Sequence, residues 1–220
     1  MCQKINTFKK TIIKDISLNY LLYLPKNYNE DDKFPLVIFL HGAGERGEDL
    51  KLVKIHGIPK LIAGGKNFPF IAISPQCPTD SWWTERTQDL NLLIDEILSN
   101  YAIDKNRVYL TGISMGGYGT WKLASEHPEK FAAILPICGG PWNVCFKEKL
   151  PKLKELPIWT FHGAKDETVP IQGTEFIVNS LKELGNEARF TIYPEAGHDS
   201  WSETYENPEI YEWLLSQSRG

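Results

Sequence analysis

Short apolar runs alternate along the chain with longer stretches in which apolar and polar positions mix. The runs are almost continuously hydrophobic, which is typical of strands buried on both faces of a parallel sheet. They cover residues 36–40, 70–74, 107–111, 132–137, 158–161 and 188–193. Nearer the N-terminus, residues 11–16 and 18–24 predict two further strands joined by a short turn.

Helical segments are expected between these strands. Residues 89–98 place apolar side chains at spacings of three and four, so that one face of a helix would be apolar. The other candidate helices cover residues 118–125, 174–184 and 208–215. Pro208 suits the first turn of its helix, and Gly185 lies where a helix C-cap would be.

Together these elements predict an α/β fold. A mostly parallel sheet of about eight strands would carry helices on both faces, joined by right-handed crossovers. In such a sheet the functional site lies at the carboxyl ends of the strands. A chain of 220 residues, of which 42% are hydrophobic, is long enough to bury its own core. We expect a single domain over residues 1–220, since no repeat or linker-like stretch divides them.

Net charge, the length of the apolar runs and the cysteine spacing argue against several classes of binding partner. The formal net charge is −4 and no basic stripe is present, which argues against nucleic-acid binding. The apolar runs are far too short to span a membrane. The cysteines are Cys2, Cys77, Cys138 and Cys145. Their spacing is not that of metal ligands, so we expect no metal site. Reduced thiols are favoured, and a disulfide that includes Cys138 and Cys145 is the alternative.

The first residues bear on localisation. Polar and basic residues rather than an apolar segment follow Met1, and we therefore expect a cytoplasmic protein. A secreted or lipid-anchored form is the alternative. In that form Cys2 would be the lipidated residue, left at the start of the chain after removal of an upstream signal.

The pentapeptide from Gly112 to Gly116, with Ser114 at its centre, carries the sharpest chemical signal. It follows one predicted strand directly and precedes a predicted helix. This is the context of the G-x-S-x-G nucleophile elbow, which forces the serine out at the top of a sheet. A glycine-rich structural turn is the alternative interpretation. We favour the elbow and take Ser114 as the candidate nucleophile.

A serine nucleophile needs a base, which is usually histidine, and an acid that orients it. In this architecture the order along the chain is serine, acid, histidine. His198 lies in the loop after the last predicted strand, where the base belongs, and we prefer it to His162, which closes a strand. Asp166 follows the penultimate strand and is the candidate acid, while the adjacent Glu167 is expected to be solvated.

Acyl transfer also needs donors for the developing oxyanion. One candidate is the backbone N–H of Met115, directly after the nucleophile. The other is the N–H of Ala43 in the glycine-rich loop after residues 36–40, with Gly44 as the near alternative. This loop lacks the lysine and the Ser or Thr that follow the glycines in a phosphate-binding loop, which argues against a nucleotide site.

Several tryptophans fall in loops at the expected catalytic edge. Trp83, Trp142 and Trp201 are candidate walls of a substrate pocket, and Trp201 is the foremost because it lies close to His198 in sequence. The alternative is that these rings pack the loops together. The connection over residues 138–156 is too short and too polar for a large lid domain, so the site should be fairly open.

At these residues the chain resembles an α/β-hydrolase. It is similar to the compact bacterial esterases grouped with phospholipase/carboxylesterase and "predicted peptidase" sequences. The matching stretches are Tyr-Leu-Pro at 23–25, HGAGERGED at 41–49, SPQCP at 74–78, TGISMGGYGTW at 111–121 and GHDSW at 197–201. The resemblance implies a carboxylic ester hydrolase without a cofactor, and it supports Ser114, Asp166 and His198 by position. Dienelactone hydrolases differ, because they carry cysteine where this chain has Ser114.

The expected reaction is two-step acyl transfer through an acyl-enzyme, on a small-molecule ester or an ester linked to a polysaccharide. The resemblance implies acetyl, feruloyl or general short-chain esterase activity. Because a histidine base must be neutral, activity should be lost below about pH 6. A peptidase or amidase of prolyl-oligopeptidase type and a non-catalytic binding protein of the same fold are the alternatives. A monomer or a homodimer is expected.

Overall fold

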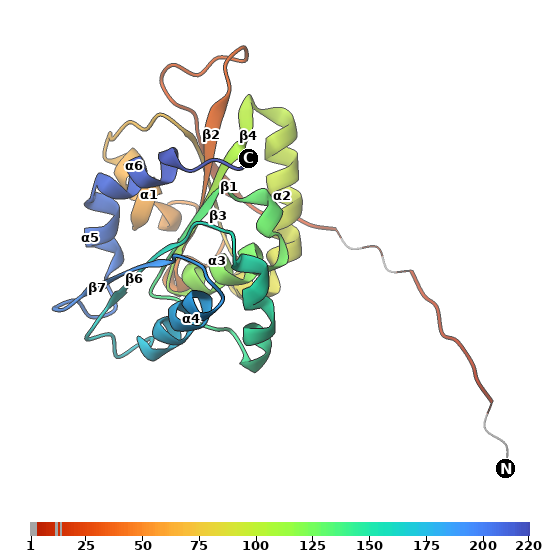
Figure 1. Cartoon of the computed structure of the whole chain (residues 1–220). Helices are drawn as coiled ribbons and strands as arrows, with labels where there is room; N and C mark the ends of the chain where they lie inside the picture. The colour runs from red at the N-terminus through yellow and green to blue at the C-terminus, as the bar shows by residue number, and fades with distance from the viewer. Residues whose placement is uncertain (1–3, 12, 14) are drawn as a thin grey trace.

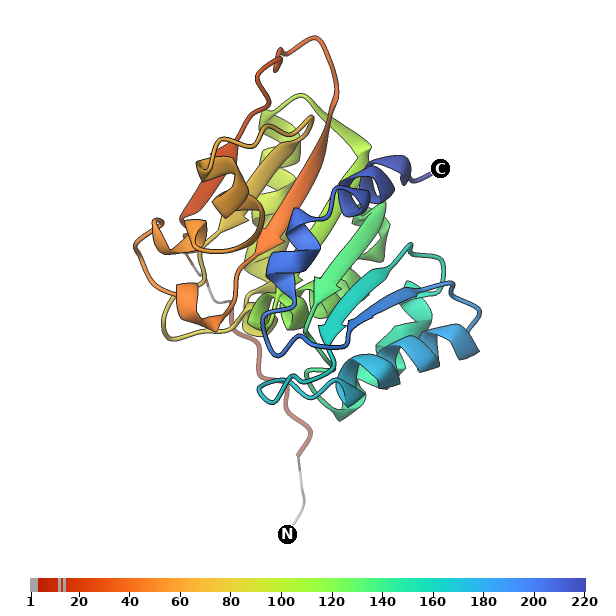
Figure 2. The ribbon, with the colours of Figure 1, turned by 90° about the vertical axis from the view of Figure 1, so that its left-hand side faces the viewer.

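The computed structural model describes residues 4–11, 13 and 15–220. In that part, seven strands form one sheet in the order β1-β3-β2-β4-β5-β6-β7 (Figures 1 and 2). β1 runs antiparallel to β3, and every other neighbouring pair is parallel. The strands are β1 (Tyr20–Tyr23), β2 (Phe34–Leu40), β3 (Ile71–Pro75), β4 (Ile103–Ile113), β5 (Ala133–Ile137), β6 (Trp159–Gly163) and β7 (Arg189–Tyr193).

Helices make most of the connections between the strands. The α-helices are α1 (Gly57–Ala63), α2 (Thr87–Asn100), α3 (Met115–Glu126), α4 (Gln172–Glu183), α5 (Trp201–Glu206) and α6 (Glu209–Ser216). The 3-10 helices are η1 (Ala43–Glu45), η2 (Leu52–Lys54), η3 (Trp83–Glu85), η4 (Pro128–Lys130) and η5 (Val144–Leu153). α2, α3, α4 and α6 match the four predicted helices to within a few residues, and Gly185, just past α4, has the expected positive φ of 87°.

Both faces of the sheet are covered, which explains the uninterrupted apolar runs. In β2, Leu36, Ile38 and Leu40 belong to a core shared with α2, α3 and α4. The alternate residues Val37 and Phe39 belong to a second core shared with α1, α5 and α6. Figure 2 shows α1, α5 and α6 lying over one face of the strands. Strand side chains alternate between faces, so each face draws on every second residue. The predicted α/β fold is confirmed.

Seven strands are found among the described residues, where about eight were predicted. The described residues of the range 11–16 lie outside every strand, and residues 12 and 14 lie outside the described part. Ile13 is 92% exposed and Ile16 is 38% exposed, so neither of these two side chains is buried in the core. The described residues near the N-terminus extend away from the sheet (Figure 1), and β1 forms its edge.

The connection between β5 and β6 contributes to the core. η5 contacts α3 and α4, and its apolar side chains Phe146, Leu150 and Leu153 are buried. The segment therefore packs in the layer of α3 and α4 and forms no large lid, as predicted.

The thiols of Cys77, Cys138 and Cys145 are free, whereas the candidate lipidation site Cys2 lies outside the described residues. Across residues 4–11, 13 and 15–220, no helix combines the length and the apolar composition that crossing a bilayer would need.

Candidate active site

The loops at the carboxyl ends of four strands carry the candidate residues. Ser114 follows β4, Asp166 comes after β6, and His198 comes after β7. The candidate oxyanion loop begins at His41, directly after β2. Because these strands are parallel, their carboxyl ends lie along one edge of the sheet, and residues far apart in sequence meet there.

Ser114 occupies a sharp turn between β4 and α3. Its φ of 51° and ψ of −115° are unusual for a residue with a side chain, and such strain is concentrated at functional sites. The turn is close to two neighbouring segments. A Cβ on Gly116 would lie 2.0 Å from the Leu40 carbonyl oxygen, and one on Gly112 would lie 2.4 Å from the Gly116 oxygen. The two glycines are therefore required by the close approach of backbone on both sides of Ser114.

A continuous chain of hydrogen bonds joins the three predicted residues. His198 Nε2 lies 2.9 Å from Ser114 Oγ, and His198 Nδ1 lies 2.8 Å from Asp166 Oδ2. A carboxylate only accepts, so Nδ1 carries the proton and Nε2 is free to accept the serine hydroxyl. The arrangement can therefore withdraw a proton from Ser114.

Asp166 is held as a carboxylate by several donors. Its side chain is fully buried, and Oδ1 accepts hydrogen bonds from the backbone N–H groups of Thr168 and Val169, each at 2.9 Å. Burial alone would raise the pKa of Asp166. The hydrogen bond from His198 and those from the two N–H groups outweigh it, and the pKa of this carboxyl lies below its usual value. Asp166 is thus set to orient an imidazole.

His162 lies behind Asp166 and has its own partners. Its Nδ1 lies 2.8 Å from Thr174 Oγ1, its Nε2 lies 2.8 Å from the Val169 carbonyl, and the same Nε2 lies 3.2 Å from Asp166 Oδ2. Burial lowers the pKa of His162. Both ring nitrogens are engaged within the core. His162 therefore contacts the candidate acid Asp166 from inside the core, and the sequence pattern did not indicate this contact.

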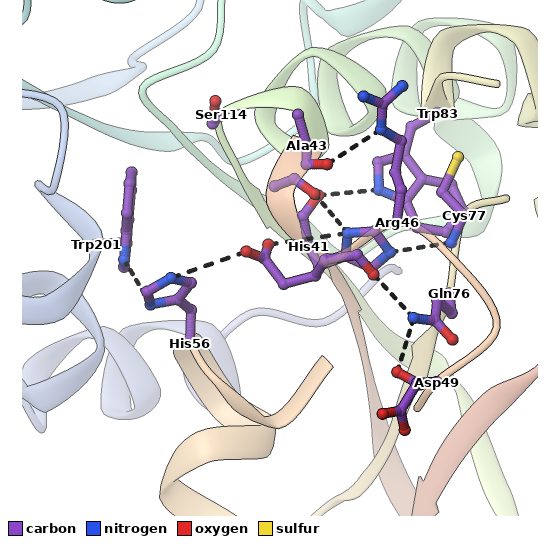
Figure 3. Close-up of polar contacts among 12 residues, drawn as sticks. His41, Ala43, Arg46, Asp49, His56, Gln76, Cys77, Trp83, Ser114 and Trp201 are labelled. Carbon is purple, nitrogen blue, oxygen red and sulfur yellow. Dashed lines mark hydrogen bonds and ion pairs between the residues drawn. The ribbon is translucent and has the colours of Figure 1, made fainter. Parts of the chain in front are cut away.

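His41 holds the candidate oxyanion loop through both of its ring nitrogens (Figure 3). Nδ1 donates to the Gly42 carbonyl at 2.6 Å, and Nε2 accepts from the Cys77 backbone N–H at 2.9 Å. The ring must be neutral to make both bonds. Burial lowers the pKa of His41 to about 4, which agrees with that requirement.

The two candidate oxyanion donors begin helical segments. Ala43 is the first residue of η1 and Met115 is the first residue of α3, so neither N–H has an intrahelical acceptor. The carbonyl of Ala43 accepts a hydrogen bond from Arg46 Nε at 3.0 Å, which fixes the orientation of the loop (Figure 3).

The three candidate pocket tryptophans occupy different environments. Trp201 lies beside the candidate base His198, because the two rings meet edge-on with 5.2 Å between their centroids. Trp142 is half-buried and packs on Phe146 of η5 at 4.3 Å. Trp83 departs from the expectation of a pocket wall. It is 0% exposed, and its indole N–H donates to the His41 carbonyl at 3.0 Å, so the ring packs beneath the oxyanion loop (Figure 3).

One group of metal-ligating side chain types occurs within the described residues. The ligand atoms of Cys138, Asp166 and His198 lie within 4.8 Å of one another. Asp166 and His198 already hydrogen-bond each other, and Cys138 is fully buried at the end of β5. The group is thus accounted for by the Ser114–His198–Asp166 chain together with a neighbouring thiol.

Known proteins share this arrangement of elements. The chain is 30% identical over 167 residues to the bifunctional acetylxylan esterase/xylanase XynS20E of Neocallimastix patriciarum, a match that covers 74% of this chain and 23% of that protein. It is 21% identical over 211 residues to the probable feruloyl esterase C of Aspergillus niger, covering 92% of this chain and 75% of that protein. The crystal structure of a thermostable esterase superposes with a TM-score of 0.79 and 39% identity.

The chain spans only part of two of these proteins. The match to XynS20E covers 23% of that protein. The match to the thermostable esterase covers 60% of that chain and 92% of this one. A model of the phospholipase/carboxylesterase family matches residues 55–209, which is well over half of the chain. This protein therefore belongs to the phospholipase/carboxylesterase family of α/β-hydrolases.

Proposed function

We propose that this protein hydrolyses carboxylic esters, with Ser114, His198 and Asp166 acting as a catalytic triad. One observation carries the proposal. Ser114 Oγ, the two ring nitrogens of His198 and Asp166 Oδ2 form an unbroken hydrogen-bonded chain with steps of 2.9 and 2.8 Å. A nucleophile, a base and an orienting acid in that geometry are the requirements for acyl transfer.

The first half of the reaction forms an acyl-enzyme. Ser114 Oγ attacks the ester carbonyl carbon as His198 Nε2 takes the hydroxyl proton. The tetrahedral intermediate then collapses, the bond between the carbonyl carbon and the alcohol oxygen breaks, and His198 gives its proton to the departing alcohol. Asp166 keeps the ring in the required tautomer and stabilises the imidazolium.

The second half of the reaction regenerates the enzyme. Water, deprotonated by His198, attacks the acyl carbon, and the carboxylic acid leaves as Ser114 recovers its proton. In both halves, negative charge develops on the former carbonyl oxygen. The N–H groups of Met115 and Ala43, which have no intrahelical acceptors, would stabilise it.

The proposed substrates are short-chain or aromatic esters of the acetyl and feruloyl type. The similarity to an acetylxylan esterase and to a probable feruloyl esterase supports this class. The absence of a large lid between β5 and β6 also supports it, because an ester attached to a polysaccharide needs an open approach. A small-molecule ester and a polysaccharide-linked ester are therefore the two substrate forms to test.

The test measures hydrolysis of p-nitrophenyl acetate, butyrate and octanoate and of methyl ferulate by wild type and by Ser114→Ala. We expect robust hydrolysis by wild type and a loss of at least about a thousandfold in kcat in the variant, since removing the nucleophile disables the whole triad. Equal background rates for both proteins would overturn the proposal. A peptide p-nitroanilide run in parallel tests amide cleavage, and a higher kcat/KM on the anilide would identify a peptidase instead.

A further inference from the structure

A second histidine–carboxylate pair lies next to the proposed triad. His56, at the N-cap of α1, stands between Glu45 of η1 and Trp201 of α5. Its Nε2 lies 3.8 Å from Glu45 Oε1, and its Nδ1 lies 3.3 Å from the indole Nε1 of Trp201 (Figure 3). The pair thus connects η1, in the candidate oxyanion loop, to α5, the helix that follows His198 in the chain.

Hydrogen-bond chemistry fixes the state of this second imidazole. An indole N–H can only donate, so Nδ1 of His56 must accept and carries no proton. The ring proton is then on Nε2, which faces the Glu45 carboxylate. The Glu45 side chain is only 9% exposed, and little solvent screens this contact. His56 thus lies between a carboxyl group and a donor, as His198 does, but with the two ring nitrogens exchanged and with the carboxyl oxygen beyond hydrogen-bond distance.

Trp201 contacts both His56 and His198, the proposed base. Its ring lies edge-on to both imidazoles, with centroids 5.4 Å from His56 and 5.2 Å from His198 and interplanar angles of 66° and 88°. Aromatic rings prefer such edge-on geometry, and a ring held this way limits the tilt of its neighbour. Asp166 fixes His198 at only one atom, Nδ1. Besides this bond and the contact of Nε2 with Ser114, the edge-on Trp201 ring adds a further constraint.

We propose that Glu45 and His56 are positioning residues that hold Trp201 edge-on against His198. They would thereby tie the oxyanion loop and the base together across the site. The inference rests on the proposed hydrolase function. The bond from Trp201 to His56 joins residues 145 positions apart, and so it links the start of α5 to the start of α1. A displacement of about 1 Å in a catalytic group can cost a hundredfold in rate, so this constraint should be visible in kcat.

The first test compares His56→Asn, His56→Gln and His56→Leu. The Asn side-chain oxygen occupies the place of Nδ1 and can still accept from Trp201, whereas the Gln oxygen occupies the place of Nε2 and cannot. We expect kcat to fall roughly tenfold in His56→Leu and His56→Gln with KM little changed, and to be largely restored in His56→Asn. His127→Leu is the matched control, because its side chain is 31% exposed against 30% for His56.

Equal kcat values for the Leu and wild-type enzymes, or equal losses in the Asn and Leu enzymes, would overturn the proposal. Glu45→Gln should lower kcat in wild type but have little further effect once His56 is Leu. Additive losses in that double-mutant cycle would remove Glu45 from the network.

A second measurement is independent of activity. The indole N–H resonance of Trp201, assigned by comparison with Trp201→Phe, should shift in His56→Leu and keep its wild-type position more closely in His56→Asn. An unchanged resonance in His56→Leu would show that His56 does not hold the ring and would overturn the inference. If wild type hydrolyses no ester, the proposed function fails, and the resonance alone still decides whether His56 anchors Trp201.

Discussion

Nδ1 of His198 lies 2.8 Å from Oδ2 of Asp166, although 32 positions separate the two residues in the chain. Asp166→Asn would replace this acceptor by an amide that can also donate, so Nδ1 would lose its proton and Nε2 would no longer accept from Ser114. We expect kcat for p-nitrophenyl acetate to fall by about a thousandfold or more.

The neighbouring acid provides a matched control for that change. Glu167 is exposed, and Glu167→Gln makes the same chemical substitution one position away. Steady-state kinetics should show wild-type kcat for Glu167→Gln. A comparable loss in both variants would place the effect in the loop rather than in the hydrogen bond to His198.

The buried ring of His41 predicts how stability depends on pH. Burial lowers the pKa of His41 from 6.5 to about 4. Between these pH values His41 is therefore protonated in the unfolded chain and neutral in the folded protein. The stabilisation is complete above about pH 6.5 and is lost as the pH falls toward 4. Its size is about 3 kcal/mol, from roughly 1.4 kcal/mol for each unit of pKa.

His41→Gln isolates that contribution, because the Gln oxygen can accept from Cys77 N–H and does not titrate. Urea unfolding at several pH values should show wild type more stable at pH 7, with the difference shrinking by about 3 kcal/mol near pH 4. A difference that stays constant with pH would mean that His41 has the same pKa in the folded and unfolded states, which would contradict this expectation.

Replacement of Trp83 should destabilise the protein far more than replacement of the adjacent Trp82. Trp83→Phe removes the donor to the buried His41 carbonyl and leaves a gap, which should lower the free energy of unfolding by about 2 kcal/mol. Trp82 is 47% exposed, and Trp82→Phe should change stability little. Chemical denaturation measures both. An unchanged stability with a raised KM in Trp83→Phe would instead support a pocket wall.

The loops that carry Asp166 and His198 touch at Gly163. A Cβ on Gly163 would lie 2.1 Å from the Gly197 carbonyl oxygen, which is backbone and cannot move aside. Gly163→Ala should therefore cost about 1–3 kcal/mol in stability and lower kcat by separating acid from base. Gly64→Ala is the control, because its Cβ would meet the nearest backbone atom at an ordinary 3.4 Å. Similar thermal shifts in both variants would contradict this expectation.

The sequence predicts the elements whose signals are local. Burial on both faces makes β2 an unbroken apolar run, and the glycines around Ser114 mark the turn between β4 and α3 without any distant information. The same holds for Asp166 and His198, since their order and their positions after strands suffice to select them. The structure brings these three side chains together as expected.

Features that depend on distant contacts could not be predicted in this way. Adjacent tryptophans look alike in sequence, yet Trp82 is 47% exposed and Trp83 is 0% exposed. His56 has no local pattern, because its partner Trp201 is 145 positions away. Ile13 belongs to an apolar run like those of the buried strands, but it is 92% exposed and the described residues of that run lie outside every strand.

The turn at Ser114 also determines the electric field around the proposed nucleophile. Because α3 begins at Met115, the positive end of the helix dipole, equivalent to about half an elementary charge, lies beside the serine. This field comes from aligned peptide groups rather than from any one side chain. A substitution that frays the first turn of α3 would therefore weaken the reactivity of Ser114 without altering any side chain of the proposed triad.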